Sequence, residues 1–353
     1  WISFGDHDMT DRIGHLTLAR TGAPEEGTRG LSLFLVPNRS ESGIPNGVTV
    51  ERIEEKLGLH GSPTCVLRFD GAHGHLIGEP GRGLPQLFGM IELMRLQVAC
   101  QGAGITLRAA ELARRYASER QQGGPPQAPP VVISKHPDVR RQLRQLDAQA
   151  TILTALALEV AVTLQQAHNG DAEAAAYAAF MLPLAKTFGG ETAFEAASGA
   201  IQVLGGAGYT REWPAERYLR DARILTIYEG TTGMQAQDFL FRRLIRDRAA
   251  GLQAFLAKAR SELASVGPSN EASLVAGIMD RFTDLSATIT TWNDEDRHVA
   301  AVGYLRAGWS AASTFLAWRL FARASAVSDD AHYWLESAEA RWESARTKAI
   351  SPI

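Results

Sequence analysis

The sequence contains few cysteines and little excess charge. Cys65 and Cys100 are its two cysteines among 353 residues, which excludes a disulfide framework and predicts two buried, reduced thiols in a reducing compartment. The formal net charge is −3, so composition gives no bulk electrostatic attraction to nucleic acid or to an anionic membrane. The histidines lack the spacing of metal ligands, and no nucleophile–base arrangement emerges.

Long hydrophobic runs are also missing. No apolar run reaches about 18 residues without a charge, which argues against a transmembrane helix, and no signal-peptide pattern is present. The chain begins at Trp1, and the first letters, WISFG, read as though they start inside a strand. We therefore expect an N-terminal part of the protein to be missing from this sequence.

Three regions follow one another along the chain. Residues 1–82 hold short β-rich runs (HLTLAR, LSLFLVP, VTVERI and CVLRF) between turn clusters, and predict a small antiparallel β-domain. Residues 83–245 show an apolar period near 3.6 and predict a helical bundle, which can bury a cofactor between facing helices. Residues 246–353 predict a second helical extension. The expected fold class is α+β and mostly α.

Glycine and proline predict the details of the bundle. Gly102 and Gly104 indicate a junction between two helices in the first long helical stretch. The prolines of QQGGPPQAPP predict a loop, and Pro137 suits the first position of the next helix.

One carboxylate stands out in the stretch RILTIYEGTTGMQAQ, residues 223–237. The β-branched and aromatic run 224–228 predicts an extended segment, and Glu229 lies where this segment turns into a helix. Its apolar neighbours would desolvate the carboxylate and raise its pKa, as a general base requires. Gly230 would let a ligand approach the backbone closely. The alternative is a surface or helix-capping glutamate, which spacing alone favours because helix starts attract acids.

A glycine-rich segment precedes this acid. QVLGGAGYTREWPAERYLRD, residues 202–221, resembles the C-terminal signature of the acyl-CoA dehydrogenase family at every defining position. WIS and LGLHGSPT resemble strands of the family's β-domain, Arg95 and Arg120 have the spacing of its helix pair, and residues from about 246 are similar to the helical extension of its longer members. The family's N-terminal helical domain has no counterpart here. The matched signature positions are Gln202, Gly205, Gly206, Gly208, Tyr209, Glu212, Arg217 and Asp221.

The resemblance implies an FAD-dependent dehydrogenase that converts an acyl-CoA to trans-2-enoyl-CoA. It implies that Glu229 removes the α-proton while flavin N5 accepts the β-hydride, and that the Glu229 N–H helps to hold the thioester oxygen. Some members take their base from another helix, at a position that is Met94 here and cannot act as a base. The implied substrate-binding residues are Glu92, Arg95, Tyr228 and Gly230.

These substrate-side residues also have plainer explanations. Glu92 and Arg95 can form an ordinary i,i+3 ion pair on a solvated helical face, and Tyr228 can be a core residue.

The resemblance also implies a set of FAD contacts, several of which the family shares across a subunit boundary, so a homodimer is expected. An arginine fork and exposed glycine N–H groups suit phosphate. As alternatives, Thr231 can cap a helix, His136 can be a structural histidine, and Trp1 can be an aromatic core residue. The implied FAD-binding residues are Trp1, Ile2, Ser3, Arg120, His136, Gln202, Gly205, Gly206 and Thr231.

Two other functions remain open on this fold. Some relatives are DNA-associated alkylation-response flavoproteins, and the run FRRLIRDR at 241–248 is rich in arginine. An acyl-CoA oxidase would differ only in passing electrons to oxygen, whereas a dehydrogenase would pass them to an electron-transfer flavoprotein. The bacterial cytoplasm is the favoured location, and the mitochondrial matrix is the alternative.

Overall fold

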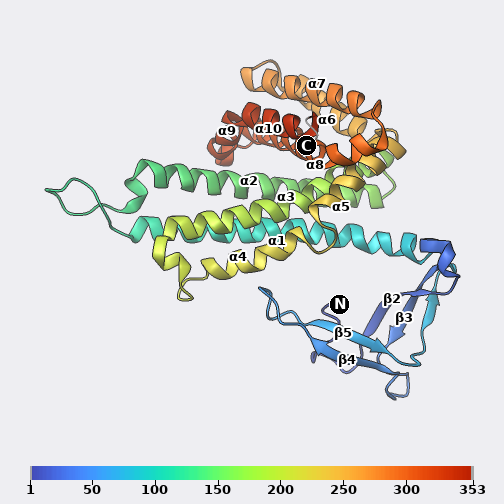
Figure 1. The fold of residues 1–353 in the computed structure, drawn as a ribbon. Helices are drawn as coiled ribbons and strands as arrows, with labels where there is room; N and C mark the ends of the chain where they lie inside the picture. Colours follow the sequence, from blue (N-terminus) through green and yellow to red (C-terminus); the bar gives the residue numbers. More distant parts are fainter. Residues whose placement is uncertain (1, 351–353) are drawn as a thin grey trace. The chain divides into compact units, whose positions relative to one another are not determined.

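The computed structural model describes residues 2–350 (Figure 1). It contains two compact units, Trp1–Met94 and Arg95–Ile353, and the first long helix begins in one unit and continues in the other. The fold class is α+β and mostly α, with antiparallel strands followed by a helical bundle and further helices. The domain boundaries expected after residues 82 and 245 stay predictions.

The first unit contains two three-stranded antiparallel sheets, in the orders β1-β5-β4 and β2-β3-β6. The four β-rich runs form strands as predicted, and His75–Ile77 is a further strand that the sequence did not reveal. Cys65 is buried as expected, but Cys100, in the second unit, is exposed, so its expected burial is wrong. The strands are β1 (Ile2–Ser3), β2 (Gly14–Arg20), β3 (Leu31–Pro37), β4 (Val48–Ile53), β5 (Thr64–Phe69) and β6 (His75–Ile77).

The second unit is helical, and α2 begins at Pro137 as predicted. The α-helices are α1 (Gly83–Glu119), α2 (Pro137–His168), α3 (Ala172–Leu204), α4 (Ala215–Arg223), α5 (Thr232–Gln237), α6 (Ala250–Val266), α7 (Asn270–Thr290), α8 (Asp294–Arg323), α9 (Ser328–Glu336) and α10 (Ala338–Ile350). The shorter elements are the 3₁₀ helices η1 (Pro24–Gly30), η2 (Ile133–Lys135), η3 (Gly205–Tyr209), η4 (Ile224–Thr226) and η6 (Ser325–Val327), and the π-helix η5 (Asp238–Arg246).

The predicted helix junction at Gly102 and Gly104 is wrong, because α1 runs through both without a break. A Cβ on Gly102 would lie 2.1 Å from the carbonyl oxygen of Gly189 in α3. Gly102 therefore permits α1 and α3 to approach closely. The sequence of one segment does not show whether a glycine marks such a close approach or the end of a helix.

The expected extended segment at 224–228 is also wrong. Residues Ile224–Thr226 form η4, directly after α4. Leu225 is 1% exposed and packs in one cluster with Val98 and Ala193, so burial of a helical turn against α1 and α3 overrides the β-propensity of the run.

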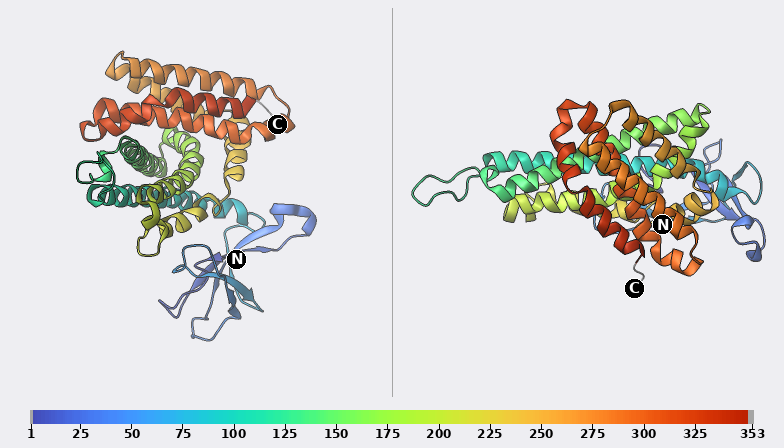
Figure 2. Two further views of the ribbon diagram at one scale, coloured as in Figure 1. Left: turned by 60° about the vertical axis from the view of Figure 1, so that its left-hand side comes forward. Right: turned by 90° about the horizontal axis from the view of Figure 1, so that it is seen from above.

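The helices α6 to α10 form a layer over α2 and α3 (Figure 2). Both layers contribute to one apolar core, in which Phe180 of α3 stacks on Phe255 of α6 with ring centroids 4.9 Å apart. By length and composition alone α2 could cross a membrane, but 56% of its most apolar window is buried inside the protein, as in the core helix of a globular fold.

Candidate active site

Glu229 lies in the turn between η4 and α5, in a backbone conformation that side chains rarely adopt. Its φ is 54°, and that of Gly230 is 97°. Gln235 Nε2 donates a hydrogen bond of 2.9 Å to the Glu229 carbonyl oxygen, and Lys186 Nζ donates to the carbonyl oxygen of Gly230. Since Lys186 and Gln235 are both fully buried, the turn that carries Glu229 is fixed from the protein interior.

The carboxylate of Glu229 is partly desolvated and faces two cations. Burial raises its pKa, while Lys186 and Arg95 pull that pKa down. Burial also lowers the pKa of Lys186 to about 8, and Arg95 adds to this effect, while Glu229 and Glu191 oppose it. A carboxylate whose pKa is raised yet held in check by neighbouring cations suits a general base near neutral pH.

Arg95 belongs to this charged group and not to a solvated helical face. It is 8% exposed, and its Nη1 lies 3.2 Å from Oδ2 of Asp238 in η5. The alternative that Arg95 forms an ordinary i,i+3 ion pair with Glu92 on a solvated helical face is therefore wrong. Glu92 lies on α1 within the first unit and is partly buried, and its role at the substrate stays a prediction.

Tyr228 and Thr231 each combine a structural contact with a position beside Glu229. The Tyr228 hydroxyl donates to Gln101 Oε1, its ring packs on the cluster around Leu225, and burial raises its pKa to about 12. Thr231 is the N-cap of α5, with its hydroxyl accepting from the Met234 N–H, so the capping explanation holds for it.

A second group of predicted residues lies near the C-terminal end of α3, whereas Lys186 is in the middle of this helix. A cavity of about 660 Å³ is lined by Arg120, His136, Gln202, Gly205 and Gly206. The Nε2 atom of His136 lies 2.7 Å from the Gln122 carbonyl oxygen. A Cβ at either glycine, 205 or 206, would meet no atom within 4 Å, so open space surrounds them. A guanidinium, an imidazole and uncrowded glycine backbone are the donors that phosphate groups use.

The two groups lie well apart on one chain. Lys186 and Gln202 are both on α3, and 16 residues at the helical rise of about 1.5 Å separate them by roughly 24 Å. The remaining predicted cofactor residues are in the first unit. Ile2 is exposed on β1, only the backbone of Ser3 is described, and Trp1 lies outside the described residues.

Residues 81–244 match the family described as acyl-CoA dehydrogenase, C-terminal domain. The chain belongs to the acyl-CoA dehydrogenase family. The match covers both groups of site residues and runs from α1 through the turn at Glu229 into η5.

Curated proteins of the acyl-CoA dehydrogenase family are also similar to this chain in sequence. The chain is 42% identical over 259 residues to 3-methylmercaptopropionyl-CoA dehydrogenase of Ruegeria pomeroyi, covering 70% of this chain and 44% of that protein. It is 38% identical over 320 residues to the broad-specificity linear acyl-CoA dehydrogenase FadE5 of Mycobacterium tuberculosis, covering 82% and 52%. The chain thus spans about half the length of the curated relatives it matches.

A solved structure from the acyl-CoA dehydrogenase family is also similar in fold. The crystal structure of Caenorhabditis elegans ACDH-11 in complex with C11-CoA superposes with a TM-score of 0.78 at 26% identity, covering 96% of this chain and 56% of that one. The helices after the family match are therefore included in this likeness.

Three residues around Glu229 and Arg95 escaped the sequence reasoning: Lys186, Gln235 and Asp238. Only Lys186 left a usable signal, as a lone cation inside the apolar helical run MLPLAKTFGG. A charge in such a run indicates a buried partner, since unpaired buried charges are costly. Among residues 2–350, no group of three or more His, Cys, Asp and Glu side chains is placed to hold a metal ion.

Proposed function

We propose that the complete protein is an FAD-dependent acyl-CoA dehydrogenase that converts an acyl-CoA thioester to its trans-2-enoyl-CoA. The observation that carries the proposal is Glu229 itself, a partly desolvated carboxylate on a fixed left-handed turn beside Lys186 and Arg95. The family membership and the names of the relatives support the same reaction.

The chain's residues have distinct tasks in this proposal. Glu229 removes the α-proton of the thioester as a carboxylate and holds it as the neutral acid. Its backbone N–H stabilises the charge that develops on the thioester oxygen, as in an oxyanion hole. Gly230 leaves room for the thioester, and Tyr228, Glu92 and Arg95 are proposed to face the rest of the acyl-CoA.

FAD, when bound, supplies the hydride acceptor for the β-carbon. The cavity that holds Arg120, His136 and Gln202 has the donors that suit the pyrophosphate of FAD. Trp1, Ile2, Ser3 and Thr231 are proposed as the other contacts. Because this cavity lies roughly 24 Å along α3 from the Glu229 turn, we propose a homodimer in which each flavin site draws on both chains.

An electron-transfer flavoprotein is the proposed electron acceptor, and an oxidase would instead release peroxide. The DNA-associated alternative loses support, since three of the four arginines at 241–248, Arg242, Arg243 and Arg246, form ion pairs within the protein. Arg243 is 8% exposed and contacts Asp247, which also pairs with Arg246.

The test is anaerobic reduction of the flavin by acyl-CoA in the complete protein. Wild type should bleach its flavin, and Glu229→Gln should slow bleaching by about 10²- to 10⁴-fold, the usual contribution of a general base. Glu111→Gln, which alters an exposed carboxylate on α1, should bleach like wild type. Equal bleaching by wild type and Glu229→Gln would show that another group is the base.

A further inference from the structure

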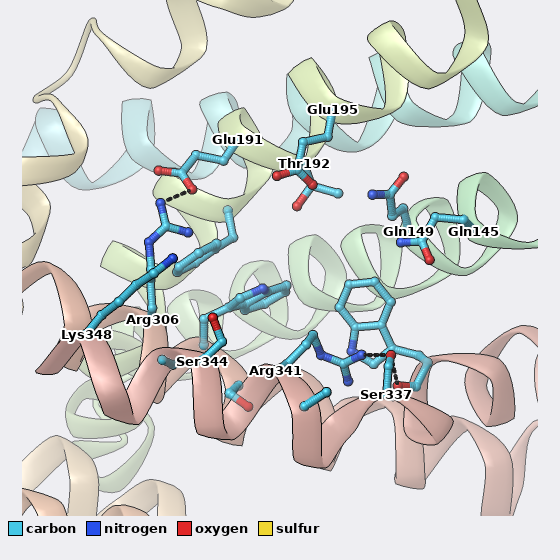
Figure 3. Close-up of a pocket in the computed structure, with 16 residues that line it drawn as sticks. Gln145, Gln149, Glu191, Thr192, Glu195, Arg306, Ser337, Arg341, Ser344 and Lys348 are labelled. Atoms are coloured by element: carbon cyan, nitrogen blue, oxygen red, sulfur yellow. Dashed lines mark hydrogen bonds and ion pairs between the residues drawn. The ribbon is translucent and has the colours of Figure 1, made fainter. Parts of the chain in front are cut away.

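A cavity separate from the Glu229 turn lies between the two helical layers of the second unit. It has a volume of about 420 Å³, and α2 and α3 line one side of it while α8, α9 and α10 line the other. Figure 3 shows Gln149, Thr192 and Glu195 on one side and Arg341 and Ser344 on the other. Its size is within the range of small-molecule sites.

Arg341 lines this cavity, and two of the three nitrogens of its guanidinium lack a hydrogen-bond partner. Its Nη1 donates to Ser337 Oγ at 2.5 Å, and its guanidinium carbon lies 4.3 Å from the ring centre of Trp334. Nε and Nη2 are buried and have no hydrogen-bond partner. Burial lowers the pKa of Arg341 to about 9, so the folded protein disfavours this charge as long as no anion faces it.

The other charges around the cavity do not neutralise Arg341. Arg306 Nη2 lies 2.9 Å from Glu191 Oε2, and the other oxygen of Glu191 accepts a 2.9 Å bond from the Thr232 hydroxyl. Glu191 is therefore occupied by its own partners. Buried donors in native proteins are nearly always paired, so the two free nitrogens of Arg341 call for an acceptor.

We propose that this cavity binds a small organic carboxylate, whose two oxygens are held by Nε and Nη2 of Arg341. Both nitrogens are covered by protein atoms in this structure, so the Arg341 side chain turns this edge into the cavity when the carboxylate binds. These two nitrogens lie on one edge of the guanidinium, the edge that matches a planar carboxylate in bidentate fashion. Trp309 and Trp334 provide an apolar wall for the body of such a ligand. The nearby carboxylates of Glu191 and Glu195 disfavour a doubly charged anion such as phosphate.

The experiment measures the thermal unfolding of the complete protein with increasing sodium benzoate, at constant ionic strength set with sodium chloride. Wild type should show a Tm that rises with benzoate concentration, because a ligand that binds only the folded state stabilises it. Arg341→Met should weaken benzoate binding by about tenfold or more, since a charge-assisted bidentate contact is lost. Arg346→Met removes an exposed cation from the same helix and should respond like wild type.

Two further measurements make the result decisive. Arg341→Lys keeps the charge but loses the fork, and it should also weaken binding. Fluorine NMR of 4-fluorobenzoate reports binding directly, with line broadening by wild type that is lost in both Arg341 variants. Equal responses in wild type and the Arg341 variants, no response in wild type, or an Arg341-dependent response to inorganic phosphate alone would each overturn the proposal. None of these readouts depends on acyl-CoA oxidation.

Discussion

At the scale of single residues, Lys186 and Glu229 are electrostatically coupled. Lys186 is fully buried on α3, donates to the Gly230 carbonyl oxygen and lowers the pKa of the neighbouring carboxylate. Burial of Glu229 acts in the opposite direction and raises that pKa. Lys186 is thus a positioning residue for the proposed base, through both the turn geometry and the charge.

Replacing Lys186 by Met should therefore shift the pH dependence of the reaction. Without the ammonium group, burial of Glu229 is less opposed, so its pKa rises further and the base is protonated up to a higher pH. The acid limb of the kcat/KM profile should move to higher pH, as measured by acyl-CoA-dependent dye reduction. Lys258→Met, which alters a cation paired with Glu159, is the matched control. An unmoved acid limb in Lys186→Met would show that the charge of Lys186 does not act on the base.

The sequence drew attention to Glu229, Arg95 and Tyr228, but not to Lys186, Gln235 and Asp238. The glycine-rich signature and the apolar neighbours are local, so they are visible in one stretch of sequence. Lys186 lies 43 residues before Glu229, and Asp238 meets Arg95 across 143 residues. Such contacts arise only when α1, α3 and η5 pack together, and no pattern within a segment encodes that packing.

At the scale of elements, α1 and α3 approach closely because of glycine. A Cβ on Gly102 would lie 2.1 Å from the Gly189 carbonyl oxygen, whereas a Cβ on Gly104 would meet no atom within 4 Å. The two glycines lie in the interior of the same helix, so their helix propensities are equal. They differ only in what a methyl group would touch.

This pair predicts opposite effects of the same substitution. Gly102→Ala should destabilise the protein by about 1–3 kcal/mol or more, because the methyl group forces the two backbones apart. Gly104→Ala should stabilise it by about 0.5–1 kcal/mol through helix propensity alone. Chemical denaturation of both variants measures the difference. A similar free energy of unfolding in both variants would mean that α1 and α3 do not pack at Gly102.

Helices and strands were predictable from the sequence wherever the local residue pattern favours the same structure as the packing around the element. The β-rich runs of β2 and β3 and the helical period of α2 are such cases. The prediction of an extended segment at 224–228 was wrong because the burial of Leu225 against neighbouring helices outweighs the β-propensity of these residues.

At the scale of the molecule, one apolar core of the second unit spans both helical layers. Phe180 of α3 contacts Phe239, Phe255 and Phe282, the last two from helices after residue 246. Glu159 of α2 also pairs with Arg319 of α8 at 2.7 Å and with Lys258 of α6 at 3.1 Å. The helices after residue 246 therefore share buried contacts with the part of the chain that carries Glu229.

A shared core predicts that the two layers unfold together. Phe255 is fully buried between them, so Phe255→Ala should destabilise the protein by about 3–5 kcal/mol. Differential scanning calorimetry of the complete protein should show the transition of the second unit moved to a lower temperature but still single. Val266→Ala, at the exposed end of the same helix, should leave it unchanged. If Phe255→Ala instead split off a separate low-temperature transition, the helices after residue 246 would be an independently folding domain, because only their own core would have been weakened.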